Sequence, residues 1–132
     1  MNGKLMVKTS RYWYEGDGRL DITAKTKDPI GRLLSPTWPL VLRYKRKTIS
    51  ESQYKRRYLE MVKARFEDNP KAVKELFGMG EVVIVCFCPD GEFCHRFLAA
   101  EFLESMGAKY KGEVKVAPSK KKAEGFGFTK RD

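Results

Sequence analysis

The chain has 132 residues, 42% of them hydrophobic and 12% aromatic, and a formal net charge of +10. This composition excludes an intrinsically disordered protein and indicates one domain large enough to bury a core. No apolar run is long enough to span a bilayer, and no apolar signal core follows the N-terminus. We therefore expect a cytoplasmic protein without a membrane partner. Three cysteines cannot all pair within one chain, which fits a reducing compartment.

The first third of the chain predicts two short strands and much loop. Residues 5–9 are β-prone, and residues 20–23 alternate apolar and polar side chains as a half-exposed strand does. Between them, the run Arg-Tyr-Trp-Tyr at 11–14 suits stacking on a nucleotide, although aromatic residues of a small domain more often belong to its core. Residues 25–37 contain Asp-Pro, Gly and Ser-Pro turn signals and predict a loop.

The middle of the chain predicts three helices. Residues 37–44 suit a short helix with proline in its first turn. Ser50 and Gln53 have the spacing of a capping box, which opens a longer helix over 50–68. One face of that helix collects apolar side chains at steps of three and four, namely Tyr54, Tyr58, Met61, Val62 and Phe66. Residues 68–70, Asp-Asn-Pro, predict the cap and start of a third helix that ends at Gly78.

The stretch 82–96 is the most informative part of the sequence. An apolar run from Val82 predicts a strand buried on both faces, and Pro89-Asp90-Gly91 predicts the turn that follows it. Apolar residues then recur at helical spacing from His95, and Gly107 stands where a C-cap glycine belongs. A last short strand is expected at 113–116. In open α/β sheets, ligands bind beyond the carboxyl ends of the strands, which places a candidate site at this turn.

Helices and strands alternate along the chain. We therefore predict a single α/β domain over 1–117, a layered and mostly parallel sheet flanked by helices as in Rossmann-like folds. Residues 118–132 hold three consecutive lysines and Gly125-Phe126-Gly127, and predict a basic flexible tail.

The three cysteines and the single histidine allow three interpretations. In the first, Cys94 is a nucleophile or redox group near a helix N-terminus, with His95 as acid or base and Arg96 as the second member of an anion-binding pair with Cys94. In the second, a zinc or iron ion binds to the set Cys86, Cys88, Cys94 and His95. In the third, these side chains only pack and cap. The cysteine-to-arginine spacing differs from that of the cysteine phosphatase loop, and the zinc deaminase signatures are missing.

The residues from Val82 to Arg96, with Ala99 and Glu101 beyond, resemble the signature of the domain of unknown function 488 family. The segments around Trp38 and Ser50 look like its small archaeal and phage members. The resemblance covers roughly residues 5–112 and rests on the Cys-His-Arg motif after a cysteine-bearing strand. It implies an α/β domain and no assigned reaction.

Two functional hypotheses follow. The first is an enzyme that acts on a phosphate-bearing ligand, a nucleotide or nucleic acid, through Cys94, His95 and Arg96. The alternative is a non-catalytic nucleic-acid-binding module that uses the basic helix residues Lys55, Arg56 and Lys63 together with the tail. A lysine-rich solvated surface would look the same in sequence. No residue pattern predicts a cofactor, a metal is not our first choice, and no pattern indicates an oligomeric state.

Overall fold

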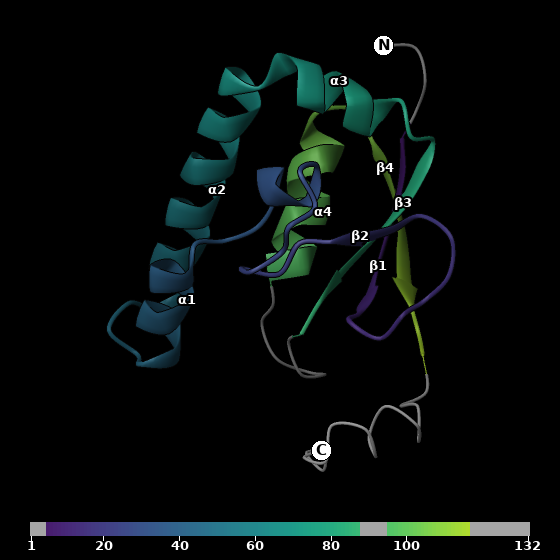
Figure 1. The fold of residues 1–132 in the computed structure, drawn as a ribbon. Helices are drawn as coiled ribbons and strands as arrows, with labels where there is room; N and C mark the ends of the chain where they lie inside the picture. The colour runs from purple at the N-terminus through teal and green to yellow at the C-terminus, as the bar shows by residue number, and fades with distance from the viewer. Residues whose placement is uncertain (1–4, 88–94, 117–132) are drawn as a thin grey trace.

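The computed structural model describes residues 5–87 and 95–116 (Figure 1). They form one four-stranded sheet, four α-helices and a 3₁₀ turn. In chain order these are β1 (Met6–Arg11), β2 (Arg19–Asp21), the 3₁₀ turn Gly31–Leu33, α1 (Trp38–Lys45), α2 (Glu51–Asp68), α3 (Pro70–Phe77), β3 (Glu81–Cys86), α4 (His95–Ser105) and β4 (Lys109–Val114). The α/β prediction is confirmed. The predicted tail at 118–132 lies outside the described residues.

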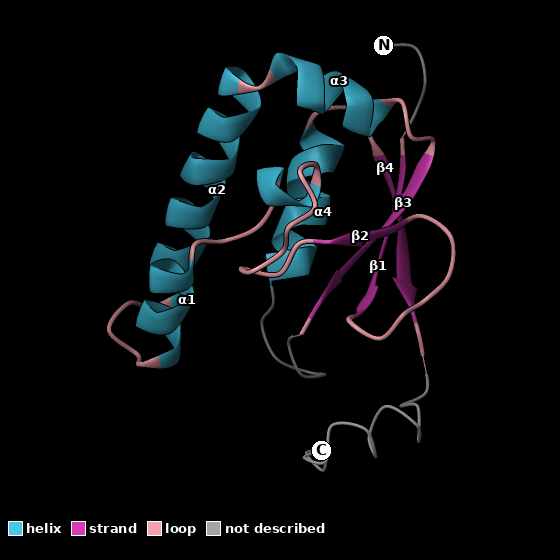
Figure 2. Cartoon of the chain, viewed as in Figure 1, coloured by secondary structure: helices cyan, strands magenta, loops and turns pink. Residues whose placement is uncertain are grey.

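All strand pairs are parallel, in the order β2-β3-β1-β4 (Figure 2). The strands β3 and β1 are central, and their register places Val7 beside Val82 and Arg11 beside Cys86. Side chains of a strand alternate between faces, so Val82, Ile84 and Cys86 share one face. They belong to the main hydrophobic core, whereas Val83 and Val85 face the other side and are buried as well. The expectation of a strand covered on both faces is confirmed.

The described helices lie on one side of the sheet (Figure 1). Helix α4 packs against β1, β3 and β4, and α2 packs on α4 from outside. Tyr54, Tyr58, Val62 and Phe66 form the buried face of α2, as the sequence predicts, and the Phe66 ring meets the Phe102 ring of α4 edge-on at 4.9 Å. At the other end of α4, the Tyr58 ring lies 6.0 Å from the His95 ring, so α2 packs along the length of α4.

A short crossover covers the opposite face. Residues 12–18 lead from β1 over β3 to β2 without a helix, although parallel connections usually contain one. Arg19 anchors this segment: its Nε donates to the Tyr14 carbonyl at 2.8 Å and its Nη2 to the Tyr12 carbonyl at 2.7 Å. Arg19 is the β-ladder neighbour of Val83, so the segment lies over the buried Val83 and Val85.

The three crossovers share one hand. The connections from β2 to β3 and from β3 to β4 move in one direction across the sheet on its helical side. The connection from β1 to β2 moves the opposite way on the opposite side. This consistency is what the right-handed crossover rule requires of parallel sheets.

Helix ends follow the sequence signals at one site and depart from them at another. Ser50 and Gln53 form the predicted capping box, with bonds of 3.1 Å and 2.8 Å between side chain and backbone. The predicted start of α3 is confirmed, with Asn69 at the N-cap position and Pro70 in the first turn, but the Asn69 side chain makes no cap bond. Its Nδ2 instead donates to the Arg65 carbonyl of the preceding helix at 2.9 Å. Gly107 follows α4 with a φ of 108°, as a C-cap glycine does.

Part of the sheet differs from expectation. The predicted strand at 113–116 begins earlier, at Lys109, and ends at Val114. Within it, the register to β1 shifts between Val7 and Lys8, where Gly112 has a φ of 110°. Such a bulge changes which side chains share a face.

No helix among the described residues is both long and apolar enough to cross a membrane.

Candidate functional site

The carboxyl ends of β1 and β3 form a topological switch point. Arg11 and Cys86 end these neighbouring strands side by side. From Arg11 the chain crosses toward β2 on one face of the sheet, and from Cys86 it continues toward α4 and β4 on the other. Chains that leave adjacent parallel strands in opposite directions open a crevice, and ligands of open α/β folds bind there. The turn singled out in the sequence starts at this position.

Two aromatic rings stack where the chain leaves β1 and β3. The rings of Tyr12 and Phe87 stack with centroids 4.1 Å apart and planes inclined by 20°. The Arg19 guanidinium lies 4.5 Å from the Tyr12 centroid. Phe87 is 56% exposed, so this stack ends in an accessible ring. Residues 11–14, at the start of the crossover, are half-buried and lie outside the main hydrophobic core.

Arg96, in the first turn of α4, is almost fully buried, with 2% of its surface exposed. Its Nε and Nη2 donate to the two carboxylate oxygens of Glu113 at 3.2 Å and 3.0 Å. Its Nη1 lies 3.4 Å from the Cys86 Sγ. The planar guanidinium therefore joins the ends of β3 and β4. An anion that binds to Arg96 has to compete with Glu113 for these donors.

The Glu113 carboxylate belongs to a longer chain of hydrogen bonds. Thr9 Oγ1 donates to Glu113 Oε1 at 2.6 Å, and the Tyr110 hydroxyl lies 2.7 Å from Thr9 Oγ1. Because Thr9 has one hydroxyl hydrogen and gives it to Glu113, Tyr110 is the donor to Thr9. Regular alternation would place residues 110 and 113 on opposite faces, and the bulge at Gly112 brings both to the helical face.

His95 is buried beside Arg96, with 8% of its surface exposed. Its Nε2 lies 3.0 Å from the Ile22 carbonyl. A carbonyl only accepts, so Nε2 carries the proton, and in the neutral ring Nδ1 holds the lone pair. Burial lowers the pKa of His95 below its usual 6.5, while Cys86 and the bond to Ile22 oppose that shift. At neutral pH His95 is therefore uncharged and suited to accept a proton at Nδ1.

The structure brings together only part of the predicted cluster. Cys86 is a buried free thiol next to Arg96, and His95 begins the same helix turn. Cys88 and Cys94 lie outside the described residues, so the nucleophile and the metal interpretations stay predictions. Within the described segments, no three Cys, His, Asp or Glu side chains are grouped to hold a metal ion.

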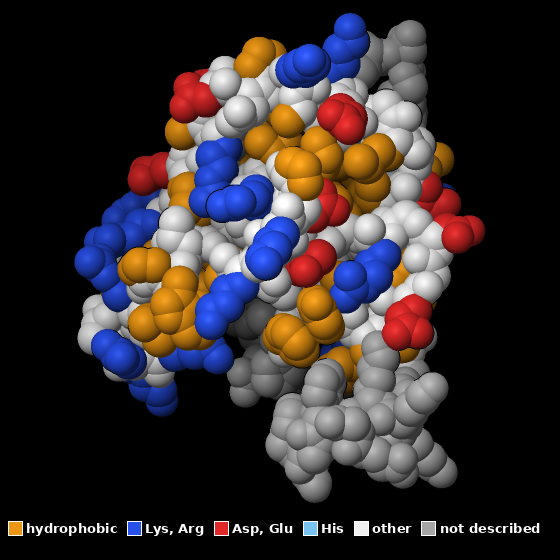
Figure 3. Space-filling view, in the orientation of Figure 1, with side chains coloured by type: hydrophobic (Ala, Val, Ile, Leu, Met, Phe, Trp, Pro, Cys, Tyr) orange, Lys and Arg blue, Asp and Glu red, His pale blue; other side chains and the backbone are white. Residues whose placement is uncertain are grey.

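The predicted nucleic-acid-binding residues form a separate surface. Lys55, Arg56 and Lys63 are exposed on α2, which is separated from the sheet by α4. Lysine and arginine side chains gather over α1 and α2 in the space-filling view (Figure 3).

Sequence reasoning missed Thr9, Tyr110 and Glu113. Each lies in a segment that reads as an ordinary strand, and none has a local motif that marks it. Only the parallel pairing of β1 with β4 brings them together, and the register that aligns them depends on the bulge.

Comparison with known proteins gives a family and no individual relative. A family model described as the active DUF488-N3 subclade, DUF488-N3a, matches residues 2–107. No curated protein and no solved structure matches the chain. The match spans most of the chain and includes the strand, the cysteine-bearing turn and the Cys-His-Arg motif. The chain belongs to the DUF488 family.

Proposed function

We propose that this protein is a cytoplasmic, thiol-dependent enzyme that acts on a phosphate-bearing ligand with a planar ring, a nucleotide or a nucleic acid. Its reacting centre is the crevice beyond β1 and β3. Cys94 is the nucleophile or redox group, His95 exchanges protons through Nδ1, and Arg96 supplies positive charge. The observation that carries the proposal is the switch point, because the cysteine-bearing turn starts there and the buried pair His95 and Arg96 follows it.

The charges of the described residues support this assignment of roles. A guanidinium near a thiol favours the thiolate, the nucleophilic form, and Arg96 is two residues from Cys94 in the sequence. Arg96 directly follows His95 and Cys94 in sequence and is fixed by Glu113 rather than free to swing into solvent. The neutral imidazole of His95 suits a general base. The accessible end of the Tyr12–Phe87 stack suits a nucleobase ring.

Alkylation of the three thiols tests the enzyme proposal. Purified protein is treated with iodoacetamide over a pH series, and each cysteine is followed by peptide mass spectrometry. We expect Cys94 to react first, with an apparent pKa below the roughly 8.5 of a free thiol. Inorganic phosphate should slow Cys94, and Cys88→Ser should leave its rate unchanged. If Cys86 reacts first, or no thiol reacts before unfolding, the proposal is wrong.

A second candidate is a non-catalytic nucleic-acid-binding module, favoured by the exposed cations Lys55, Arg56 and Lys63 on α2. Fluorescence anisotropy with a labelled single-stranded oligonucleotide at several salt concentrations tests it. Charge reversal at Lys55 or Lys63 should weaken binding and make its salt dependence shallower by about 0.7 per lost phosphate contact. Lys71→Glu on α3 removes an equally exposed lysine and is the matched control. Equal losses of affinity in the α2 variants and in Lys71→Glu would show that the oligonucleotide is attracted only nonspecifically to a basic protein.

A further inference from the structure

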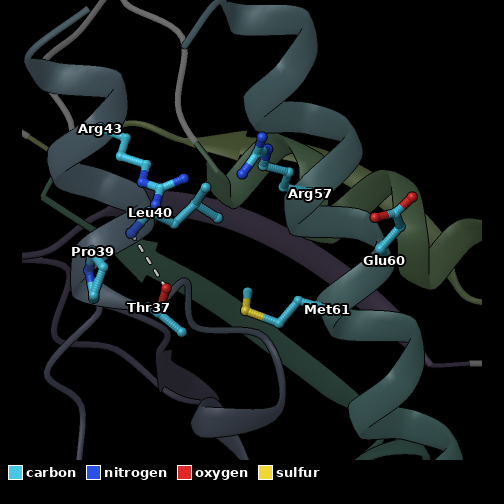
Figure 4. A pocket seen from close by; sticks show the side chains of 7 residues that line it. All are labelled: Thr37, Pro39, Leu40, Arg43, Arg57, Glu60 and Met61. Atoms are coloured by element: carbon cyan, nitrogen blue, oxygen red, sulfur yellow. Dashed lines mark hydrogen bonds between the residues drawn. The ribbon is translucent and has the colours of Figure 1, made fainter. Parts of the chain in front are cut away.

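Helices α1 and α2 enclose an open groove of about 490 Å³. Its size is that of a small-molecule site rather than of a single bound ion. Leu40 and Met61 provide apolar surface between the two helices (Figure 4). The lining residues are Thr37, Pro39, Leu40, Arg43, Arg57, Glu60 and Met61. None of them belongs to the crevice beyond β1 and β3.

Two arginines from different helices face this groove. Arg43 comes from α1 and Arg57 from α2, and their guanidinium groups turn toward one another (Figure 4). Within the described part of the chain, neither side chain makes an ion pair or a hydrogen bond. Two like charges on the walls of one groove repel each other, and an anion between them removes that repulsion.

The carboxylate that lines the groove does not neutralise this pair. Glu60 follows Arg57 by three residues on α2, and its side chain points away from both guanidinium groups (Figure 4). The positive charge of Arg43 and Arg57 is therefore directed into the groove, next to the apolar surface of Leu40 and Met61.

We propose that this groove binds a small phosphate ester of about the size of a nucleoside monophosphate. Each guanidinium offers a planar fork of N–H donors, and a phosphate has enough oxygens to accept from two forks at once. The organic part of the ligand lies on Leu40 and Met61. The residues that line this groove do not include Cys94, His95 or Arg96, so the groove is a second candidate anion site.

Isothermal titration of the full chain with adenosine monophosphate tests the site. We expect Arg43→Gln and Arg57→Gln each to weaken binding by about 10-fold or more, the loss of one charge-assisted contact. Arg43→Lys keeps the charge but loses the fork and should give an intermediate loss. Lys71→Gln, which removes an exposed cation of α3 outside the groove, should leave the affinity unchanged. Circular dichroism checks that each variant is folded.

Several outcomes would overturn the proposal: no binding of the monophosphate, equal weakening by Lys71→Gln, or full affinity in both arginine variants. A single-stranded oligonucleotide titrated in parallel distinguishes the source of the phosphate. If the arginine variants weaken only the oligonucleotide, the groove is part of an extended nucleic-acid surface and not a small-ligand site. Failure here is separable from failure of the enzyme proposal, because thiol alkylation reports on the cysteine-bearing turn alone and Arg57→Gln should not change it.

Discussion

His95 is the single histidine of the chain, so its titration can be followed without interference from another imidazole. Burial lowers its pKa, and NMR of the imidazole protons should therefore give a value below 6.5. At pH values between the pKa of His95 in the folded protein and 6.5, the unfolded chain binds more protons than the folded one. The free energy of unfolding should therefore rise with pH in this window and fall as the pH drops below 6.5. Urea unfolding from pH 5.5 to 7.5 should show this slope, and His95→Gln should remove it. An unchanged slope in His95→Gln would assign the effect to other groups.

The ion pair between Arg96 and Glu113 is the second prediction at this scale. Glu113→Gln leaves the buried guanidinium without its counter-charge, and we expect a loss of about 2–3 kcal/mol in the free energy of unfolding, below the range for fully buried pairs because Glu113 is partly exposed. Arg96→Met together with Glu113→Gln should cost less than the sum of the single changes. Additive losses would show that the two side chains do not stabilise each other.

The exposed pair Lys8–Glu81 is the control for that cycle. Its atoms approach to 2.8 Å, but both side chains are open to solvent. Glu81→Gln should leave the urea midpoint nearly unchanged, because solvent and salt screen such pairs.

At the scale of elements, the N-termini of α2 and α3 allow a direct comparison of a helix with a side-chain cap and one without. Ser50 closes a capping box on α2, whereas Asn69 makes no cap bond to α3. Ser50→Ala should therefore lower the free energy of unfolding by about 1 kcal/mol. Asn69→Ala removes a residue type that is equally favoured at caps and should cost clearly less. Equal losses in thermal or urea unfolding would contradict the structural difference.

Helices were predicted well from sequence because their signals are local. The capping box and the apolar steps from Tyr54 to Phe66 lie within one segment, and the structure confirms both. Strand β4 was predicted less well: its bulge at Gly112 depends on pairing with β1, more than a hundred residues earlier. The strand and helix on either side of the candidate site were predictable, because the apolar run from Val82 and the helical spacing from His95 are local patterns. The partner of Arg96 was not, since nothing near Glu113 distinguishes it from a surface strand residue.

At the scale of the whole molecule, the crossover at 12–18 covers the face of the sheet opposite the four described helices. The sequence pointed to aromatic residues at 11–14 as core or as a stacking surface. The structure places Tyr12 between Arg19 and Phe87, and the Trp13 ring under the Arg11 guanidinium. The Tyr12 ring thus joins the crossover segment to the residue that follows β3.

Arg19 holds this crossover in place, which leads to the last prediction. Arg19→Met removes two hydrogen bonds to carbonyls and the contact with the Tyr12 ring, and we expect a loss of about 2 kcal/mol in the free energy of unfolding. Detachment of the segment should also expose Tyr12, Trp13 and Tyr14, so chymotrypsin should cleave there faster than in the unchanged protein.

Two variants make the test specific. Arg19→Lys keeps the charge but cannot reach both carbonyls with a planar fork, so its cleavage rate should be intermediate. Arg32→Met removes an exposed arginine outside the crossover and should leave cleavage at 12–14 unchanged. If Arg19→Met resists chymotrypsin as well as the unchanged protein does, the crossover is held by its aromatic packing and not by Arg19. In that case Val83 and Val85 would stay covered, and the Phe87 ring at the crevice would keep its position.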